Sequence, residues 1–215
     1  MNIYSVEQLR FSYDGKFTLF IEKFEMGESC VGLVGPSGSG KTTLLLNLAL
    51  LLKGTWKKFQ FLEEDVTETN MERLRRRVTY VAQHPILLRR TVFENIAYPL
   101  LLRRISKEKI TERVEMIAQL FDLKDLLNKK PWQLSGGQAK RACLARAFVF
   151  EPKVILLDEP TADLDEKSRR ILNDVLRIYS DRTSFIIVSH EIDWLSDLCE
   201  KIYAMNDGVL KGMKS

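Results

Sequence analysis

The first part of the chain alternates apolar and polar residues, which is the pattern of half-buried β-strands. Met1–Tyr13 and Phe17–Glu25 both show this alternation, and Asp14-Gly15 lies between them. An Asp-Gly pair between two such segments predicts a β-hairpin. The short apolar run Cys30–Val34 that follows predicts a buried strand.

A second apolar stretch, Lys41–Leu52, has apolar residues on nearly every side of a helix. It is shorter than the ~20 residues of a membrane span, so we expect a helix of the protein core. Lys53-Gly54 is predicted to end this helix, because helix C-termini favour a cation followed by a glycine.

Strand-like and helix-like segments alternate through most of the remaining chain. Apolar runs predict strands at Val78–Ala82, Val154–Leu157 and Phe185–Val188, and a closing hairpin at Ile202–Met205 and Val209–Lys211. Helices are predicted at Met71–Arg76, Gln138–Val149, Asp165–Tyr179 and Glu191–Cys199. Such alternation predicts an α/β fold with a largely parallel sheet wrapped by helices.

A long helical region in the middle of the chain interrupts this alternation. Apolar residues recur at helical spacing between Thr91 and Leu127, with turns expected near Pro99 and Ser106. We therefore expect residues 85–149 to form an inserted helical subdomain. Residues 1–84 and 150–215 are expected to form an antiparallel β subdomain and a parallel core, so that 1–215 is one domain.

Composition and charge narrow the class of protein. The 215 residues are 45% hydrophobic and 29% charged, which suits a folded domain. The chain opens without the pattern of a secretory signal, and its three cysteines lack metal-ligand spacing, which fits a reducing compartment.

Charge is distributed unevenly along the sequence. Met71–Lys130 holds 14 Lys/Arg and 7 Asp/Glu, a surplus of +7, so the rest of this +4 chain carries −3. The surplus fits either a solvated helical face or a basic surface beside an acidic partner or an anionic membrane face. No aromatic pattern or motif supports nucleic-acid binding, and we expect no nucleic-acid partner.

A complete phosphate-loop motif stands between the strand Cys30–Val34 and the apolar helix. Its residues fit the pattern G-x-x-x-x-G-K-[ST] in the required strand–loop–helix setting. Glycines let backbone N–H groups turn toward an anion, and the helix N-terminus adds its positive end. Lys41 can reach the β- and γ-phosphates, and Thr42 can ligate Mg²⁺. The predicted nucleotide-binding residues here are Gly35, Pro36, Ser37, Gly38, Ser39, Gly40, Lys41, Thr42 and Thr43.

Two carboxylates follow the apolar run Val154–Leu157. Asp158, at the tip of a buried strand beside a phosphate loop, is placed to hold Mg²⁺ directly or through water. Glu159 is then placed to polarise a water for in-line attack on the γ-phosphate. Together the two motifs predict a P-loop nucleotidase, and a small-molecule kinase or a GTPase would show both.

The segment Leu134–Gln138 separates these candidates. It places a hydroxyl, two adjacent glycines and a side-chain amide at the start of a helix. That is a second phosphate-binding surface, with exposed N–H groups and a positive dipole end. One domain has one γ-phosphate to contact and already has a loop for it. We therefore expect this surface to contact ATP on another copy, through Ser135, Gly136, Gly137 and Gln138.

These motifs resemble, over essentially the whole length, those of the nucleotide-binding subunit of an ATP-binding-cassette (ABC) transporter. Leu134–Gln138 reproduces the family signature without a substitution, and is called the signature segment below. Gly35–Thr42, the phosphate loop, resembles the Walker A motif, and Val154–Glu159 resembles the Walker B motif. The resemblance implies a P-loop NTPase core, ATP and Mg²⁺ as ligands, and transport-coupled ATP hydrolysis.

The resemblance also suggests roles for four residues outside these motifs. Gln83 resembles the family's glutamine that contacts Mg²⁺ and water and forms a hinge to the helical subdomain. Asp165 stands at the D-loop aspartate position, and His190 resembles the switch histidine at the γ-phosphate. Tyr13 resembles the aromatic residue that stacks on adenine, for which Phe11 is the competing candidate. The implied catalytic residues are Glu159, His190, Lys41 and Gln83, and the implied Mg²⁺ ligands are Thr42, Gln83 and Asp158.

Two kinds of partner are implied as well. On binding ATP the chain is expected to form a homodimer, or a heterodimer with a related cassette, which opens again after hydrolysis. Separate integral membrane subunits are expected to dock near Gln83 and the basic segment, which implies a peripheral position on the cytoplasmic face of the cell membrane. His84-Pro85 and Thr91–Leu100 look most like importer-type subunits, some of which carry oxyanions such as tungstate or phosphate. The alternative is a non-transport ABC ATPase with soluble partners, for example in cluster assembly.

Overall fold

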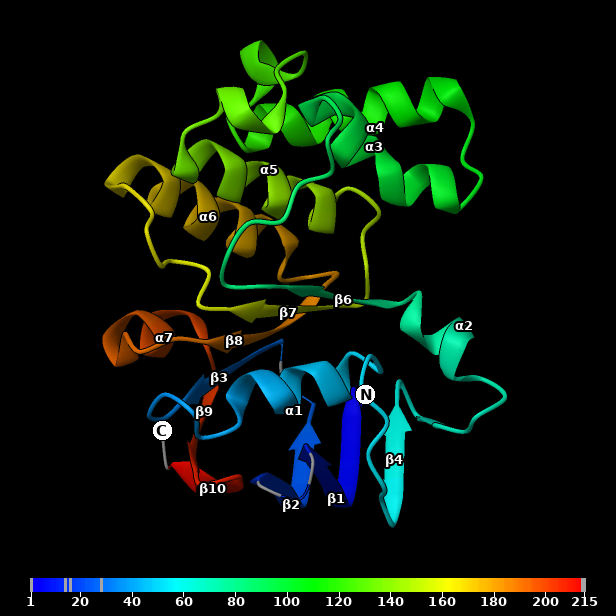
Figure 1. Ribbon diagram of the computed structural model, residues 1–215, viewed down its shortest axis with the longest axis vertical. Coiled ribbons are helices and arrows are strands. Elements are labelled where there is room, and N and C mark those ends of the chain that lie inside the picture. Colours follow the sequence, from blue (N-terminus) through cyan, green and yellow to red (C-terminus); the bar gives the residue numbers. More distant parts are fainter. Residues whose placement is uncertain (1, 14, 16, 28, 214–215) are drawn as a thin grey trace.

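The computed structural model describes residues 2–13, 15, 17–27 and 29–213. Within this part of the chain, ten strands form one sheet in the order β5-β4-β1-β2-β10-β9-β3-β8-β7-β6 (Figure 1). Its parallel part contains β9 (Lys201–Asn206), β3 (Cys30–Val34), β8 (Ser184–Val188), β7 (Val154–Asp158) and β6 (Val78–Val81). The prediction of an α/β fold with a parallel core is confirmed.

The antiparallel part of the sheet is built on the predicted hairpin. β1 (Tyr4–Tyr13) pairs with β2 (Phe17–Met26) along nearly its whole length, while Met1 and Asp14 lie outside the described residues. β10 (Val209–Met213) pairs with both β2 and β9, and so joins the two parts. At the other edge, β4 (Lys58–Phe61) and β5 (Glu64–Asp65) were not predicted, because runs this short carry little periodicity.

The parallel strands are apolar along their whole length because both of their faces are covered. On β7, Ile155 and Leu157 join the core under the helical layer, whereas Val154 and Leu156 join the core around α1 (Lys41–Leu48). Successive side chains of a strand point to opposite faces, so one continuous apolar run fills two cores.

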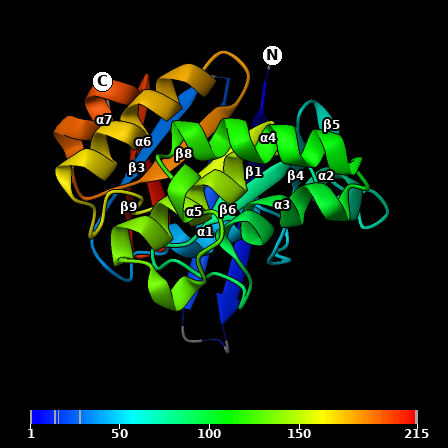
Figure 2. The ribbon, with the colours of Figure 1, turned by 90° about the horizontal axis from the view of Figure 1, so that it is seen from above.

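The helices lie on both sides of these strands. α1 lies between the parallel strands and the antiparallel hairpin (Figure 1). On the other side, α3 (Val92–Leu102), α4 (Lys107–Leu120) and α5 (Gly136–Phe148) pack on one another as a helical layer (Figures 1 and 2). The remaining helices are α2 (Met71–Arg75), α6 (Glu166–Tyr179), α7 (Ile192–Leu198) and two 3-10 turns, Lys124–Leu126 and Pro131–Gln133.

This helical layer has the position expected of the inserted subdomain, and the boundaries at residues 85 and 149 stay a prediction. None of the helices in the described ranges is long and apolar enough to span a membrane.

Two predictions about helix geometry are wrong. The apolar helix ends at Leu48 instead of Leu52, because Leu50 takes a left-handed φ of 58° that stops the helix before Lys53-Gly54. Pro99 lies inside α3 and forms no turn there. Ile96 and Leu100 on that helix are fully buried, and this packing outweighs the lost backbone hydrogen bond.

A third boundary differs at the signature segment. The helix was expected to begin at Gln138 after a glycine-bearing loop, but α5 begins at Gly136, directly after its cap Ser135. Ser135 Oγ accepts a hydrogen bond from Gln138 N at 3.3 Å, and Gln138 Oε1 accepts one from Ser135 N at 3.0 Å. This reciprocal pair, a capping box, draws both glycines into the first helical turn.

Candidate functional site

Four parallel strands end at one edge of the sheet, and a predicted site residue follows each of them. β3 leads into the phosphate loop, β7 into Glu159, β8 into His190 and β6 into Gln83. Because parallel strands present their carboxyl ends at one edge, residues far apart in sequence converge there. They line a cavity of about 470 Å³, together with Tyr13 and Asp158.

The phosphate loop forms one wall of this cavity. Backbone φ angles of 151° at Gly35, 77° at Gly38 and 102° at Gly40 lie in the region that favours glycine. A Cβ atom at Gly35 would lie 2.1 Å from the carbonyl oxygen of Met205, so no larger residue fits there. The loop residues that line the cavity are Ser37, Gly38, Gly40, Lys41, Thr42 and Thr43, whereas Gly35, Pro36 and Ser39 do not.

Lys41 supplies the positive charge of the cavity. Its Nζ donates to the carbonyls of Gly35 and Pro36, both at 2.8 Å, so the ammonium lies folded over the loop. Burial lowers the pKa of Lys41, and the carboxylates of Glu159 and Asp158 oppose that shift. The arrangement holds a cation at the place where the loop turns, which suits a polyphosphate ligand.

Thr42, the last residue of the phosphate loop, contacts Asp158. Thr42 Oγ1 donates to Asp158 Oδ2 at 2.7 Å, and Tyr80 OH donates to the same oxygen at 3.0 Å. Hydroxyl, carboxylate and the nearby Gln83 amide are hard oxygen donors of the kind Mg²⁺ prefers. The described residues contain no group of three or more His, Cys, Asp or Glu suited to a metal. The donor set therefore fits Mg²⁺.

Glu159 and His190 are neighbours in the lining of the cavity. His190 Nε2 lies 3.2 Å from Glu159 Oε1, and this buried oxygen has no well-aligned hydrogen-bond donor. Burial raises the pKa of Glu159, with a smaller opposing effect from His190. A carboxylate that water and donors stabilise poorly is suited to accept a proton.

The two adenine-stacking candidates are distinguished by position. Tyr13 lies at the end of β1, is 45% exposed and lines the cavity, whereas Phe11 does not. The Phe11 ring packs edge-on against Tyr13, with ring centroids 4.8 Å apart. Phe11 therefore supports the orientation of Tyr13, and Tyr13 is the aromatic side chain open to a ligand.

The signature segment and Asp165 lie elsewhere. None of Ser135, Gly136, Gly137 and Gln138 lines the cavity of its own chain. Asp165 caps α6, where its carboxylate accepts a hydrogen bond from Ser168 N at 2.8 Å. The pKa of Asp165 is lowered first by the Ser168 side chain and then by this backbone contact. In one copy, therefore, the expected ATP-binding residues fall into two separate groups.

Sequence reasoning missed two residues at the site. The sequence predicts Tyr80 only as part of the apolar strand β6, whereas in the structure its phenol reaches the carboxylate of Asp158 on the neighbouring strand. Lys140 is buried on α5 although it is charged, and its ammonium contacts the backbone of Gln83 and Glu159. The sequence signal for a buried lysine is that Lys140 is followed, within a predicted helix, by Arg141 and then by three apolar residues.

Comparison with known proteins agrees with this geometry. The family model described as "ABC transporter" matches residues 23–162. The tungstate uptake system ATP-binding protein TupC of Peptoclostridium acidaminophilum is 35% identical over 208 residues, 95% of this chain and 94% of that protein. The sulfate/thiosulfate import ATP-binding protein CysA of Bacillus cereus is 40% identical over 190 residues, 85% of this chain and 53% of that protein.

A solved structure of the same architecture has been described in a nucleotide-bound state. It is the dimeric, post-hydrolysis state of the ATP-binding cassette MJ0796 bound to ADP and Pi. Its TM-score is 0.86 at 26% identity, over 99% of this chain and 100% of that one. These matches agree with the phosphate loop, the paired carboxylates and the signature segment described above. The chain thus belongs to the ABC transporter family, as an ATP-binding subunit that hydrolyses ATP.

Proposed function

We propose that two copies of the chain, or one copy and a related cassette, close around two ATP molecules. Each ATP would lie between the phosphate loop of one copy and the signature segment of the other. The observation that carries this proposal is the separation of the two groups in one copy, because Ser135–Gln138 lines no part of its own cavity. The exposed helix N-terminus at Gly136 is an anion-binding surface that its own chain leaves unused.

Within one site, each group has a role that follows from its position. The backbone N–H groups of the loop and Lys41 bind the β- and γ-phosphates, and Tyr13 stacks on adenine. Thr42, Asp158 and Gln83 hold Mg²⁺, which when bound neutralises charge that develops on the phosphates. Asp165, at the start of α6, is proposed to contact the neighbouring copy's site.

Hydrolysis needs a base and a group that senses the γ-phosphate. Glu159 orients a water and accepts its proton, for which the buried, weakly solvated carboxylate is suited. His190, 3.2 Å from that carboxylate, contacts the γ-phosphate. Loss of this phosphate removes the group that both copies bind, so the dimer opens and Gln83 transmits the change to the helical layer.

Substitution Glu159→Gln tests the shared site. The amide is isosteric and cannot take up a proton, so ATP should still bind and close the dimer while turnover stops. Static light scattering with Mg·ATP should give twice the mass of the chain without nucleotide. A protein that binds ATP and yet stays monomeric would refute the shared site.

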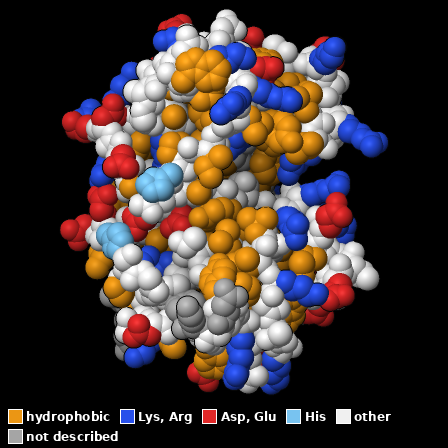
Figure 3. Space-filling view, viewed as in Figure 1, with side chains coloured by type: hydrophobic (Ala, Val, Ile, Leu, Met, Phe, Trp, Pro, Cys, Tyr) orange, Lys and Arg blue, Asp and Glu red, His pale blue; other side chains and the backbone are white. Residues whose placement is uncertain are grey.

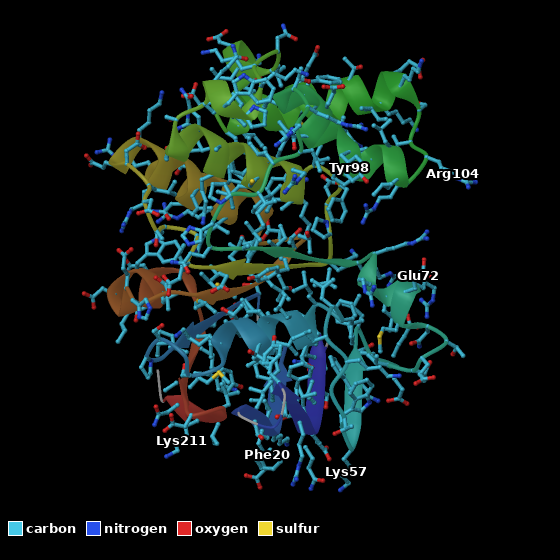
Figure 4. The ribbon with its side chains drawn as sticks, in the orientation of Figure 1. Phe20, Lys57, Glu72, Tyr98, Arg104 and Lys211 are labelled. Carbon is cyan, nitrogen blue, oxygen red and sulfur yellow. The ribbon has the colours of Figure 1, made fainter. Side chains whose placement is uncertain are left out.

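A groove between the helical layer and β6 is the proposed docking surface for a membrane subunit. Its volume is about 510 Å³, and its exposed apolar residues include Ile86, Tyr98 and Leu102. In Figure 3 apolar side chains gather between the helical layer and the sheet, with Lys and Arg side chains around them. Figure 4 shows Tyr98 and Arg104 on the upper side of this gap and Glu72 of α2 on the lower side.

The chemistry of this groove supports one kind of occupant. An apolar floor with Arg103 and Arg146 at its rim suits a short amphipathic helix that carries an acidic residue. Such a segment, exposed by a membrane subunit, would place this chain peripherally on the cytoplasmic face of the membrane. Gln83 is the second residue after β6, so a docked helix would lie close to the site loop that is proposed to respond to ATP.

Two neighbouring leucines provide a matched test of this surface. Leu102 lines the groove and is 63% exposed, whereas Leu101 is 49% exposed and does not line it. Leu102→Glu should abolish co-purification of multi-span membrane proteins from native cells in detergent, and Leu101→Glu should not. Recovery of soluble partners alone with the unaltered protein would favour the alternative, a non-transport ABC ATPase such as one in cluster assembly.

For the transported compound, we propose uptake of a small solute, with oxyanions as the first class to test. The names of two relatives, tungstate uptake and sulfate/thiosulfate import, support this choice. In membranes containing the purified complex, tungstate, sulfate or phosphate with its binding protein should stimulate ATP hydrolysis. Stimulation by cationic or uncharged solutes only would exclude the oxyanion class.

A further inference from the structure

Lys140 is a buried cation that the mechanism above does not use. It lies in α5, two residues after the signature segment, and only 3% of its surface is exposed. Burial of an ammonium group is unfavourable unless polar partners replace its water. None of the ion pairs among the described residues includes Lys140.

Three main-chain carbonyls take the place of a carboxylate. Lys140 Nζ donates to the carbonyl oxygen of Gln83, to that of Glu159 at 3.3 Å and to that of Ala82 at 3.5 Å. An ammonium group has three N–H donors, so these contacts use all of them. The acceptors lie where the chain leaves β6 and β7, beyond the last ladder pairs of those strands.

The contact with Glu159 bears on the geometry of the reacting carboxylate. Glu159 has a backbone φ of 44°, a left-handed conformation that a non-glycine residue keeps only when its surroundings hold it. Its N–H donates to the Val188 carbonyl at 3.0 Å, and its carbonyl accepts from Ala162 N at 3.2 Å as well as from Lys140. Lys140 is therefore one of three contacts that fix this peptide and the direction of its side chain.

The contact with Gln83 bears on the hinge. Gln83 lines the cavity, and its backbone carbonyl accepts a hydrogen bond from Lys140. Lys140 thus connects the Gln83 loop and the Glu159 loop with α5, the helix that begins in the signature segment.

We propose that Lys140 is a positioning residue for ATP hydrolysis, which holds the backbone of Gln83 and Glu159 in a fixed position relative to α5. A movement of α5 is then passed directly to the two loops of its own ATP site. The shared site proposed above makes α5 the helix that contacts the other copy's ATP. On that basis, Lys140 couples the two ATP sites of the dimer.

Lys140→Met tests the positioning role, because methionine keeps much of the volume and removes every donor. Its kcat should fall at least about tenfold, as expected for the loss of charge-assisted hydrogen bonds that hold the backbone of Gln83 and Glu159. The Kd of ATP should stay within about twofold, because Lys140 makes no contact with the phosphate loop that binds the phosphates. Lys140→Gln, whose amide supplies two donors, should recover part of the kcat.

Lys53→Met is the matched control, since Lys53 is an exposed lysine paired with Glu68 on the surface. It should leave both kcat and Kd unchanged. A purely structural role for Lys140 predicts a different pattern, in which the melting temperature, ATP binding and kcat fall together and glutamine restores none of them. That pattern, or a wild-type kcat in Lys140→Met, would overturn the positioning role.

The coupling is tested in the Glu159→Gln background by light scattering. There Lys140→Met should raise the ATP concentration needed for dimerisation about tenfold, again with unchanged ATP binding to the monomer. If Glu159→Gln itself stays monomeric, the shared site fails and the coupling with it. If Glu159→Gln dimerises and the double variant dimerises at the same ATP concentration, the coupling alone is wrong.

Discussion

The hydroxyl of Tyr80 allows a quantitative test of how Asp158 is held. Tyr80→Phe removes one donor to Asp158 Oδ2, at 3.0 Å, and leaves the second donor, Thr42, in place. A hydrogen bond to a charged group contributes about 1.5–3 kcal/mol, and because Tyr80 is only half-buried we take about 1–2 kcal/mol. If the carboxylate needs that contact to hold Mg²⁺ in the transition state, kcat should fall about 5- to 30-fold.

The assay is phosphate release at saturating ATP across a Mg²⁺ titration. The apparent affinity for Mg²⁺ should weaken in Tyr80→Phe, whereas ATP binding measured in EDTA should not change. Tyr203→Phe is the control, because Tyr203 OH also donates over 3.0 Å, but to the carbonyl of Glu25, and neither residue lines the cavity. Equal losses in the two variants, or no loss in Tyr80→Phe, would refute the role of Tyr80.

Three further substitutions test other contacts. Gly35→Ala forces a side chain against a backbone carbonyl of β9 at a φ of 151°; strain of about 1–3 kcal/mol plus the clash should lower the melting temperature by several degrees, and an unchanged melting curve would contradict this. Ser135→Ala should cost about 1 kcal/mol of stability and weaken ATP-induced dimerisation, whereas Thr91→Ala, in the matching capping box of α3, should cost stability alone. Arg169 lowers the pKa of Glu191 from 4.5, so Arg169→Met should reduce the free energy of unfolding by about 0.5–1 kcal/mol above pH 4.5. This difference from the unaltered protein should vanish as the pH falls through the lowered pKa of Glu191. A difference that persists in acid would exclude this ion pair as its source.

Local patterns were enough to predict the parallel core. The run Val154–Leu157 is apolar because β7 is covered on both faces, and any strand in that position needs such a run. The phosphate loop was equally predictable, since backbone φ angles such as 151° at Gly35 restrict its sequence. These elements are determined by residues that are neighbours in sequence.

The features that the sequence does not predict depend on contacts between residues far apart in sequence. Tyr80 and Asp158 are 78 positions apart, and Lys140 and Gln83 are 57 positions apart. No local pattern indicates such pairs, and each depends on strands and helices that the whole chain brings together. The early end of α1 has the same origin, because tertiary packing decides where an apolar run leaves the helix.

Cross-linking between the phosphate loop and the signature segment tests the central claim most directly. Ser37 and Ser135 are both exposed, and the three native cysteines are buried, so Ser37→Cys and Ser135→Cys can be introduced separately in the Glu159→Gln background. When the two proteins are mixed with Mg·ATP and oxidised, a disulfide-linked species of twice 24.9 kDa should form, and neither protein alone should give it. A mixture that stays at the mass of one chain, or that cross-links equally without ATP, would contradict an ATP site shared between two copies.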